Sequence, residues 1–405
     1  MNGDSSVSAR SLSPADPALN AGTGHATATR SRTRQVMFII NSLAGGGAER
    51  VMCTLLRASQ AEQRDFRIVL LLLDRQEMTY QVPEGIEVRQ LDCRHSLVRS
   101  IWSVFQALRR ARPDVTVSFL TRANIANVVA ASILRIPAII SERVNTSSHL
   151  GGGLGGAVAR WIVRMTYPRA RRVIAVSQGV ADDVQASFGV ARARTVVIPN
   201  PIDFDAIRVQ AEQGEPMPLQ TSYIVAMGRL MPNKNFAMLI DAFARSGAAG
   251  TLLILGEGPE RAALEERVAG HGLQGRVVMP GFVDHPFATL RRALLYVSPS
   301  NAEGFPNALL EAMSVGIPVI STNCPSGPSE VLAETAREQV GERVSFARHG
   351  VLVAPNDPDA MAEALRAMED PARRRDYGQK ATRRAADFGV QRAKDAYWSV
   401  IRGTL

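Results

Sequence analysis

Short runs of apolar residues alternate with stretches of helical periodicity along the first half of the chain. The runs are VMFII, FRIVLLLL, VTVSFL, PAIIS, RRVIAVS and TVVIPN, and each has the length of a strand. Strands that are apolar throughout are typical of parallel sheets, because helices cover both faces of such a sheet. The segments between them, such as 48–59 and 100–112, repeat apolar residues with the period of a helix. The pattern predicts an α/β fold with a doubly wound sheet.

The alternation is interrupted at residues 199–201 by Pro-Asn-Pro, and a polar stretch then runs to Thr221. It restarts with SYIVAMG, TLLILGEG, RVVMPGF, LLYVSPS and IPVIST, which predict five more strands with helices between them. The length of 405 residues also favours two domains. Two doubly wound domains in tandem would bind a ligand in the cleft between the carboxyl ends of their sheets.

We therefore divide the chain into four segments. The predicted segments are a disordered N-terminal tail at 1–33, an N-terminal Rossmann-like domain at 34–200, a C-terminal Rossmann-like domain at 201–380, and a helix at 381–405 that packs back on the N-terminal domain.

Composition excludes several classes of protein. Apolar residues make up 46% of the chain and charged residues 21%, which excludes a disordered or collagen-like protein. The three cysteines, Cys53, Cys93 and Cys324, lie too far apart to indicate a disulfide framework or a zinc site. The longest aliphatic run, 68–73, is far shorter than the roughly 20 residues that span a bilayer. Residues 1–33 lack the apolar core of a secretory signal, so a reducing cytoplasm is expected.

Positive charge is concentrated in the first half. Residues 34–200 hold 22 arginines, no lysine and 12 acidic residues, whereas residues 201–405 hold 22 basic and 24 acidic residues. Such asymmetry suggests that the first half meets a membrane surface, a nucleic acid or a phosphorylated substrate. Biased codon use is an alternative explanation, because 44 of the 47 basic residues are arginines.

Three consecutive glycines, Gly45, Gly46 and Gly47, stand between the first predicted strand and a helix that begins near Ala48. A glycine-rich turn at a helix N-terminus exposes backbone N–H groups that suit a phosphate. The spacing matches neither GxGxxG nor GxxxxGK[ST], which disfavours a dinucleotide site and a P-loop. A flexible turn explains the glycines equally well on this evidence alone.

Two cations follow the first strand of the second half, in the sequence MGRLMPNKN. Lys234 is one of only three lysines in an arginine-rich chain, which indicates that a compact ammonium group is favoured there. Together, Arg229 and Lys234 could bind a diphosphate. The alternative is a solvated turn that carries two charges.

The most informative local pattern is SNAEGFPNALLEAMSVGIPVIST. A strand ends, a short loop follows, Pro306 suits the first turn of a helix, and Gly316 and Pro318 end that helix. Glu303 lies just before the helix and Glu311 within it, so both carboxylates can accept hydrogen bonds from sugar or ribose hydroxyls. Each glutamate alone would be interpreted as a solvated side chain, but this ordered context favours a site.

The run EGFPNALLE is a Glu-x7-Glu motif. With GRLMPNKN, LLILGEGPER, MPGF, VISTNCPSGPSEVL and GVLVAPND, it resembles the retaining GT-B glycosyltransferases of family four in order, spacing and structural context, over about residues 35–385. GGGAER and VIPNPID add features that members of this family share. The resemblance implies two Rossmann-like doubly wound domains facing across a cleft, with the acceptor bound by the domain at 34–200 and the nucleotide sugar by the domain at 201–380. It also implies transfer of a hexose or N-acetylhexosamine from a nucleotide diphosphate sugar with anomeric retention.

The resemblance also implies roles for particular residues. Arg229 and Lys234 would neutralise the diphosphate of the donor, assisted by backbone N–H groups around Gly304, Phe305 and Asn307. Fixed cations and a helix dipole would offset the negative charge that develops as the nucleotide diphosphate leaves.

Further roles follow from the same resemblance. Glu311 would bind the ribose hydroxyls, and Glu303 would contact the transferred sugar and stabilise positive charge on it. The glycines at 45–47 would close on the donor phosphate and the acceptor, and Phe282 and Val283 would line the base.

The acceptor side departs from the common pattern. Many relatives carry a histidine near the end of the strand equivalent to PAIIS, where this chain has Ser141, Glu142 and Arg143. Some polysaccharide-assembling members have a similar SER sequence. Glu142 and Arg143 are therefore candidate acceptor-binding residues.

A basic segment at 151–172 contains five arginines and no acidic residue. Apolar residues recur within it at helical spacing, namely Val158, Trp161, Ile162 and Met165. The pattern predicts that the Arg-rich stretch 157–172 binds an anionic membrane surface. The alternative is a core-facing helix whose arginines are solvated.

The resemblance thus predicts a UDP-sugar donor, with GDP-mannose as a second possibility, and a polyprenyl-diphosphate-linked glycan acceptor. The setting would be synthesis of an exopolysaccharide, capsule or O-antigen at the inner face of the plasma membrane. No metal or other cofactor is expected: Asp203-Phe204-Asp205 resembles a DxD site but follows a Pro-rich linker, and the six histidines are dispersed.

Two alternatives stay open. One is a GT-B epimerase or phosphorylase that acts on similar ligands. The other is a basic nucleic-acid-binding protein, although the chain has no recognised nucleic-acid motif, and no nucleic-acid partner is expected.

Overall fold

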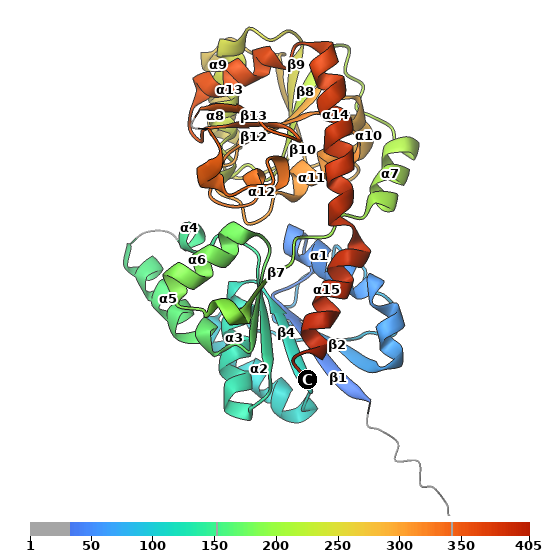
Figure 1. Ribbon diagram of the computed structural model, residues 1–405, viewed down its shortest axis with the longest axis vertical. Coiled ribbons are helices and arrows are strands. Elements are labelled where there is room, and N and C mark those ends of the chain that lie inside the picture. The colour runs from blue at the N-terminus through green and yellow to red at the C-terminus, as the bar shows by residue number, and fades with distance from the viewer. Residues whose placement is uncertain (1–32, 151–152, 342) are drawn as a thin grey trace, which may run out of the picture. The chain divides into compact units, whose positions relative to one another are not determined.

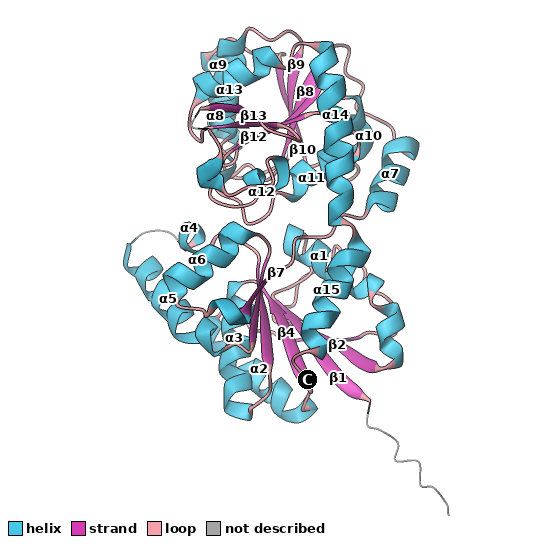
Figure 2. Ribbon diagram, viewed as in Figure 1, coloured by secondary structure: helices cyan, strands magenta, loops and turns pink. Residues whose placement is uncertain are grey.

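The computed structural model describes residues 33–150, 153–341 and 343–405. The predicted tail at 1–33 lies, apart from Thr33, outside the described residues. The described chain contains two sheets of seven strands, one from each half, with helices on both faces of each (Figures 1 and 2). The predicted α/β architecture with two doubly wound sheets is confirmed.

The first sheet is parallel throughout and has the order β3-β2-β1-β4-β5-β6-β7. Its strands are β1 (Arg34–Ile40), β2 (Phe66–Leu72), β3 (Glu87–Gln90), β4 (Val115–Phe119), β5 (Ala138–Glu142), β6 (Arg172–Ala175) and β7 (Thr195–Val197). All but β3 were predicted from their apolar runs. β3 is an edge strand with no buried residue, so an apolar run could not indicate it.

Helices cover both faces of the first sheet, as its continuous apolar strands require. These are α1 (Gly47–Ala58), α2 (Leu97–Ala111), α3 (Thr121–Leu134), α4 (Thr146–His149), α5 (Gly153–Thr166) and α6 (Gln178–Phe188), with short 3-10 turns η1 (Gln60–Arg64), η2 (Tyr167–Arg169) and η3 (Arg192–Arg194). Buried residues of α2, α3, α5 and α6 pack on one face, and those of α1 pack on the other.

The second sheet has the order β10-β9-β8-β11-β12-β14-β13. Its strands are β8 (Tyr223–Met227), β9 (Thr251–Leu255), β10 (Val277–Gly281), β11 (Leu295–Ser298), β12 (Val319–Thr322), β13 (Val344–Phe346) and β14 (Val351–Val353). β8 to β12 match the five predicted strands. β13 and β14 add an antiparallel pair of three residues each, too short for an apolar pattern to indicate.

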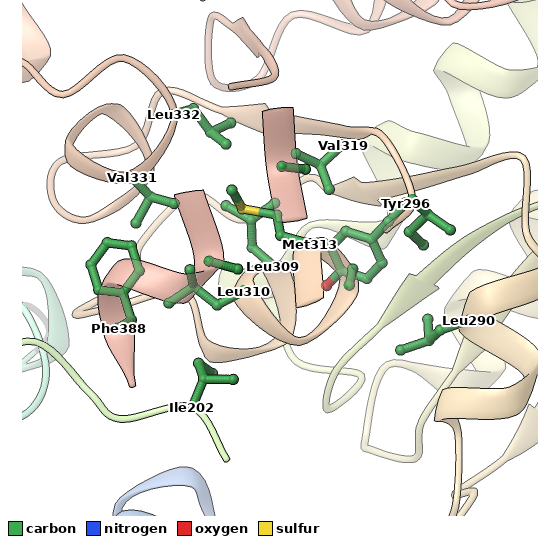
Figure 3. Close-up of a cluster of buried hydrophobic side chains, with 14 of the residues drawn as sticks. Ile202, Leu290, Tyr296, Leu309, Leu310, Met313, Val319, Val331, Leu332 and Phe388 are labelled. Atoms are coloured by element: carbon green, nitrogen blue, oxygen red, sulfur yellow. The ribbon is translucent and has the colours of Figure 1, made fainter. Parts of the chain in front are cut away.

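Eight helices belong to the second half of the described chain. They are α7 (Phe204–Gln213), α8 (Phe236–Ser246), α9 (Arg261–Gly270), α10 (Phe287–Arg292), α11 (Asn307–Ser314), α12 (Pro328–Leu332), α13 (Pro358–Ala367) and α14 (Pro371–Ala385), with 3-10 turns η4 (Pro232–Lys234) and η5 (Arg337–Gln339). Figure 3 shows how α11 is fixed: Leu309, Leu310 and Met313 lie in one apolar cluster with Tyr296 of β11 and Val319 of β12.

The polar stretch between the halves contains a helix, α7, which the sequence pattern did not predict. The Asp203 side chain accepts a hydrogen bond from the Ala206 N–H over 3.1 Å, so it caps this helix. The first carboxylate of the DxD-like sequence therefore has a structural role.

The prediction of a single C-terminal helix at 381–405 is wrong, because the structure divides this stretch among three elements. The structure has α14, which packs on α11, then the turn η6 (Ala386–Phe388), and then α15 (Val390–Arg402). α15 packs on the first sheet beside α1 (Figure 1). The chain thus passes between the halves twice, and the two crossings are joined where the Ile202 N–H donates to the Phe388 carbonyl over 2.7 Å.

Trp398 anchors α15 to the first half. Its side chain is 1% exposed, its Nε1 donates to Ser59 Oγ over 2.8 Å, and its ring centroid lies 5.0 Å from that of Phe66.

Among the described residues, no helix has both the length and the apolar character needed to cross a bilayer.

We expect Trp398→Ala to lower the free energy of unfolding by about 3–5 kcal/mol, because it leaves a large cavity in the first core. Urea denaturation followed by circular dichroism measures the loss. The matched control is Trp161→Ala on α5, whose side chain is 63% exposed and whose loss should cost no more than about 0.5 kcal/mol. Equal losses in the two variants would contradict the packing of α15.

Candidate functional site

The structure brings Lys234 and Glu303 into contact. Lys234 lies in the loop after β8 and Glu303 in the loop after β11, and these strands are neighbours in the second sheet. Because both strands are parallel, their carboxyl ends lie at one edge. Lys234 Nζ donates to Glu303 Oε1 over 2.5 Å, and both side chains are mostly buried. The pair therefore forms a fixed ammonium–carboxylate unit at the edge where α/β sheets bind ligands.

Arg229 lies five residues before Lys234 and differs from it in its surroundings. Its side chain is exposed, and it forms no ion pair with any residue that the structure describes. Its charge is close enough to Glu49 of α1 to oppose the rise in that carboxyl's pKa. Arg229 is thus an exposed cation on the same loop as Lys234, and such a cation can bind an anionic ligand.

Glu311 is buried at the second turn of α11, with 4% of its surface exposed. The Arg50 guanidinium of α1 donates to Glu311 Oε1, so the ion pair joins the two halves of the chain. Burial raises the pKa of the Glu311 carboxyl, and the Arg50 charge opposes that rise. The Arg50 side chain is more exposed than the carboxylate that it neutralises.

Glu49 and Arg50 are site residues that the sequence analysis missed. They follow the glycines in GGGAER, a motif that was noted without roles for its charged side chains. Burial raises the pKa of the Glu49 carboxyl, and Arg143 and Arg229 oppose this. A signal was available, because the first turn of a helix after a glycine-rich strand end faces the same edge as the glycines.

The glycine loop lies against the start of α11. An added Cβ at Gly47 would come within 2.9 Å of Asn307 Nδ2. The Asn200 amide donates to Asn307 Oδ1 over 2.7 Å and holds that side chain from the first half. The structure therefore places Gly47 beside Asn307, while Gly45 and Gly46 form the turn that leads into α1. The predicted contact of the three glycines with a phosphate and an acceptor stays a prediction.

Gly304 sits at a close approach of the two halves. An added Cβ would lie 2.1 Å from the Arg143 carbonyl oxygen, so only glycine fits, and the Gly304 carbonyl accepts a hydrogen bond from Ser177 Oγ over 2.9 Å. The Phe305 side chain is buried in the core, 5.5 Å from the ring of Phe388. The Asn307 N–H already donates to the Phe305 carbonyl over 3.0 Å.

Glu142 and Arg143 are buried at the end of β5 and have internal partners. The Tyr167 hydroxyl donates to Glu142 Oε2, and burial raises the pKa of this carboxyl. Arg143 donates to Asn200 Oδ1 and, over 3.0 Å, to the Tyr397 hydroxyl of α15. These hydrogen bonds form a network that fixes the end of β5. The predicted contact of Glu142 and Arg143 with an acceptor stays a prediction.

Phe282 and Val283 follow β10 at the same edge of the second sheet as Lys234. Phe282 is 73% exposed, whereas Val283 packs against the core of the second half. An exposed aromatic ring at this edge is consistent with the predicted contact to a base.

Helix α5 presents an exposed apolar face. Leu154, Val158, Trp161 and Met165 are exposed and recur every three or four residues, so they lie on one side of the helix. Ile162, which the sequence analysis assigned to this stripe, instead packs against the core beside Val163. Gly151 and Gly152, at the start of the predicted segment, lie outside the described residues.

Comparison with known protein families matches both halves of the chain. Residues 46–201 match the "Glycosyl transferase 4-like domain" model, and residues 221–370 match "Glycosyl transferases group 1".

Two curated relatives cover most of the chain. One is the N-acetylgalactosamine-N,N'-diacetylbacillosaminyl-diphospho-undecaprenol 4-alpha-N-acetylgalactosaminyltransferase of Campylobacter jejuni, 28% identical over 371 residues, which are 88% of this chain and 96% of the relative. Another is the amylovoran biosynthesis glycosyltransferase AmsD of Erwinia amylovora, 22% identical over 362 residues, with the same coverage of each chain.

Solved structures show the same fold. Anabaena HepE in complex with UDP-glucose superposes with a TM-score of 0.70 at 20% identity, covering 91% of this chain and 99% of HepE. The lipopolysaccharide outer core galactosyltransferase WaaB gives a TM-score of 0.69 at 19% identity, covering 92% of this chain and 100% of WaaB. The GT-B fold inferred from the sequence motifs is confirmed.

Removing the Arg50 charge should make stability depend more strongly on pH. The pKa of Glu311 is already raised in the folded protein, so folding takes up a proton and the free energy of unfolding falls as pH rises between the unfolded and folded pKa values. Arg50→Met raises the folded pKa further. We expect a loss of roughly 1–3 kcal/mol at neutral pH, where a buried charge is left unpaired, that shrinks toward pH ~4.

Urea denaturation across this pH range measures the effect. The control is the Arg50→Met, Glu311→Gln double variant, which has no carboxylate to titrate and should lose the added pH dependence. A loss of stability in Arg50→Met that is the same at every pH would show that Arg50 does not hold the Glu311 charge.

Proposed function

The chain belongs to the glycosyltransferases whose 4-like and group 1 domains match its two halves, and from that premise we propose a specific reaction. The enzyme transfers a hexose or N-acetylhexosamine, with retention, from a nucleotide diphosphate sugar to a lipid-linked glycan during surface polysaccharide synthesis. The observation that carries this proposal is the contact of Lys234 with Glu303 after two adjacent parallel strands of the second sheet, with Arg229 on the same loop as Lys234 and Glu311 on the helix that follows Glu303.

The cations suit the diphosphate of a donor. Arg229 is exposed and has no carboxylate partner among the described residues, so it can bind phosphate oxygens without breaking an ion pair. The Lys234 ammonium has two further N–H donors beyond the one that Glu303 accepts. As the nucleotide diphosphate leaves, these charges offset the negative charge that develops on it, without a metal ion.

The Lys234–Glu303 contact then sets the position of the transferred sugar. A diphosphate held by Lys234 places the anomeric carbon near Glu303, whose carboxylate can stabilise positive charge as the glycosidic bond breaks. The acceptor hydroxyl would attack on the face that the diphosphate leaves, which gives retention.

Glu311 suits the ribose. A carboxylate buried in the first turns of α11 accepts hydrogen bonds from two adjacent hydroxyls, and those hydroxyls would replace the N–H donor that Arg50 provides. Arg50 is then free beside the diphosphate. Donor binding therefore exchanges an ion pair between the halves for contacts through the ligand.

The relatives support the choice of donor and acceptor. HepE binds UDP-glucose, and the Campylobacter relative is named for transfer of N-acetylgalactosamine to a glycan on diphospho-undecaprenol. We propose a UDP-sugar, with GDP-mannose second, and a polyprenyl-diphosphate-linked acceptor. The exposed apolar face of α5, with Arg160 and Arg164 on the same helix, would hold the enzyme on the inner face of the plasma membrane where such acceptors lie.

A thermal-shift panel of UDP, GDP, ADP and their sugars, with and without EDTA, tests the donor site. We expect one nucleotide to raise the melting temperature selectively and EDTA to leave that shift intact. Lys234→Gln and Glu311→Gln should each remove the shift and lower transfer of radiolabelled sugar at least about 100-fold, because the first deletes the charge that holds the diphosphate and the second deletes the carboxylate that holds the ribose.

The matched control is Lys380→Gln, which removes an exposed lysine of α14 that contacts Asp376 and the Tyr377 ring on the same helix. It should keep both the shift and the transfer. Turnover like that of the wild type in Lys234→Gln or Glu311→Gln would overturn the site assignment, and a shift that EDTA abolishes would overturn the metal-free mechanism.

Membrane binding is tested separately. Val158→Ser with Trp161→Ser should weaken binding to phosphatidylglycerol-containing vesicles at least about tenfold, because burial of each side chain contributes about 1.5–3 kcal/mol. Vesicle sedimentation measures it. The control, Val209→Ser with Phe346→Ser, removes two exposed apolar side chains from the second half and should bind like the wild type. Equal binding by both variants would exclude the α5 face as the contact.

A further inference from the structure

A basic hollow lies at the edge of the first sheet opposite to the glycine loop. It has a volume of about 300 Å³ and is formed where α3 ends, where β5 begins, and where the η2 turn leads into β6. Four arginines line it: Arg135, Arg169, Arg171 and Arg194. Ile136 and Pro137 contribute apolar surface. We name these six residues the arginine hollow.

The charges of the arginine hollow are not balanced by the protein. In the described part of the chain, none of its four arginines forms an ion pair with a carboxylate. Other arginines of the first half, such as Arg57 and Arg64, also have no ion pair among the described residues, but in the hollow four such arginines line one cavity. Four guanidinium groups around one hollow repel one another, and a bound anion would relieve that repulsion.

Helix capping and hydrogen bonds within the protein do not explain why four arginines line this hollow. The carbonyls at the end of α3 are already satisfied by backbone N–H groups, because Arg135 N donates to the Ser132 carbonyl and Ile136 N to that of Ala131. Among the four guanidinium groups, Arg194 alone has a recorded partner in the described residues, the Pro168 carbonyl at 2.6 Å. The guanidinium donors of Arg135, Arg169 and Arg171 therefore have no acceptor within the part of the chain that the structure describes.

We propose that the arginine hollow binds a phosphoryl group. Guanidinium groups match phosphate oxygens with paired, charge-assisted hydrogen bonds, and the volume is within the range of small-ligand sites. The phosphoryl group is supplied either as free phosphate or as the headgroup of an anionic lipid, because the exposed Ile133 and the apolar face of α5 lie close in sequence to these arginines. The site is separate from the donor site, so it does not rest on the proposed reaction.

The test for free phosphate is methyl NMR on the full chain with labelled isoleucine. Inorganic phosphate is titrated at constant ionic strength, and the Ile136 methyl signal, assigned with Ile136→Leu, reports on the hollow alone. We expect a saturable shift whose dissociation constant is at least tenfold weaker in Arg135→Gln with Arg171→Gln. The matched control, Arg57→Gln with Arg64→Gln, removes two exposed arginines of the same half and should leave the affinity unchanged.

The test for a lipid headgroup uses phosphatidylcholine vesicles with and without phosphatidic acid. If the headgroup is the source, the Arg135→Gln, Arg171→Gln variant loses at least tenfold in binding to the phosphatidic acid vesicles, while the Arg57→Gln, Arg64→Gln variant does not. A saturable Ile136 shift identifies free phosphate as a ligand. Absence of that shift, together with equal vesicle binding by the two double variants, would overturn the proposal.

Discussion

The arrangement of the candidate site depends on one buried carboxylate, that of Glu311, whose charge is balanced by a cation from the other half of the chain. Glu311 is fixed by the apolar packing of α11, and the guanidinium that balances its charge comes from α1, in the other half of the chain. A buried charge left unpaired is costly, so Glu311 requires either Arg50 or a ligand with hydrogen-bond donors. The contact between the halves and the proposed ribose site thus share one oxygen atom of Glu311.

The segment 303–311 serves both the site and the contact between the halves. Gly304 approaches the Arg143 carbonyl so closely that no side chain fits, and Phe305 fills the core beside Phe388. At the two ends of the segment, Glu303 contacts Lys234 and Glu311 contacts Arg50. A substitution at Gly304 would thus disturb the spacing of both carboxylates, although glycine itself has no chemistry to offer.

The sequence predicts those parts of the structure that depend on local pattern. Eleven strands could be located from the apolar runs that contain them. β3 and β13 could not, because they are edge strands without a buried residue, and neither could β14, which is a strand of three residues between β12 and β13. Lys234 contacts Glu303 because their loops follow β8 and β11, which are adjacent parallel strands. The pairing of Arg50 with Glu311 could not be predicted, because it depends on how residues 261 positions apart meet in space.

The position of α15 has a consequence for how the protein is made. Tyr397, Trp398 and Ile401 belong to the core beneath the first sheet, and Trp398 reaches Ser59 across 339 positions of the sequence. During synthesis the first half emerges early, yet its core stays open on one side until residues 390–402 have been translated. The exposed apolar surface that remains is a site for chaperones or for misassociation, because long-range contacts form last. Because α15 is translated last, the core of the first half can be completed only after the second half has been synthesised.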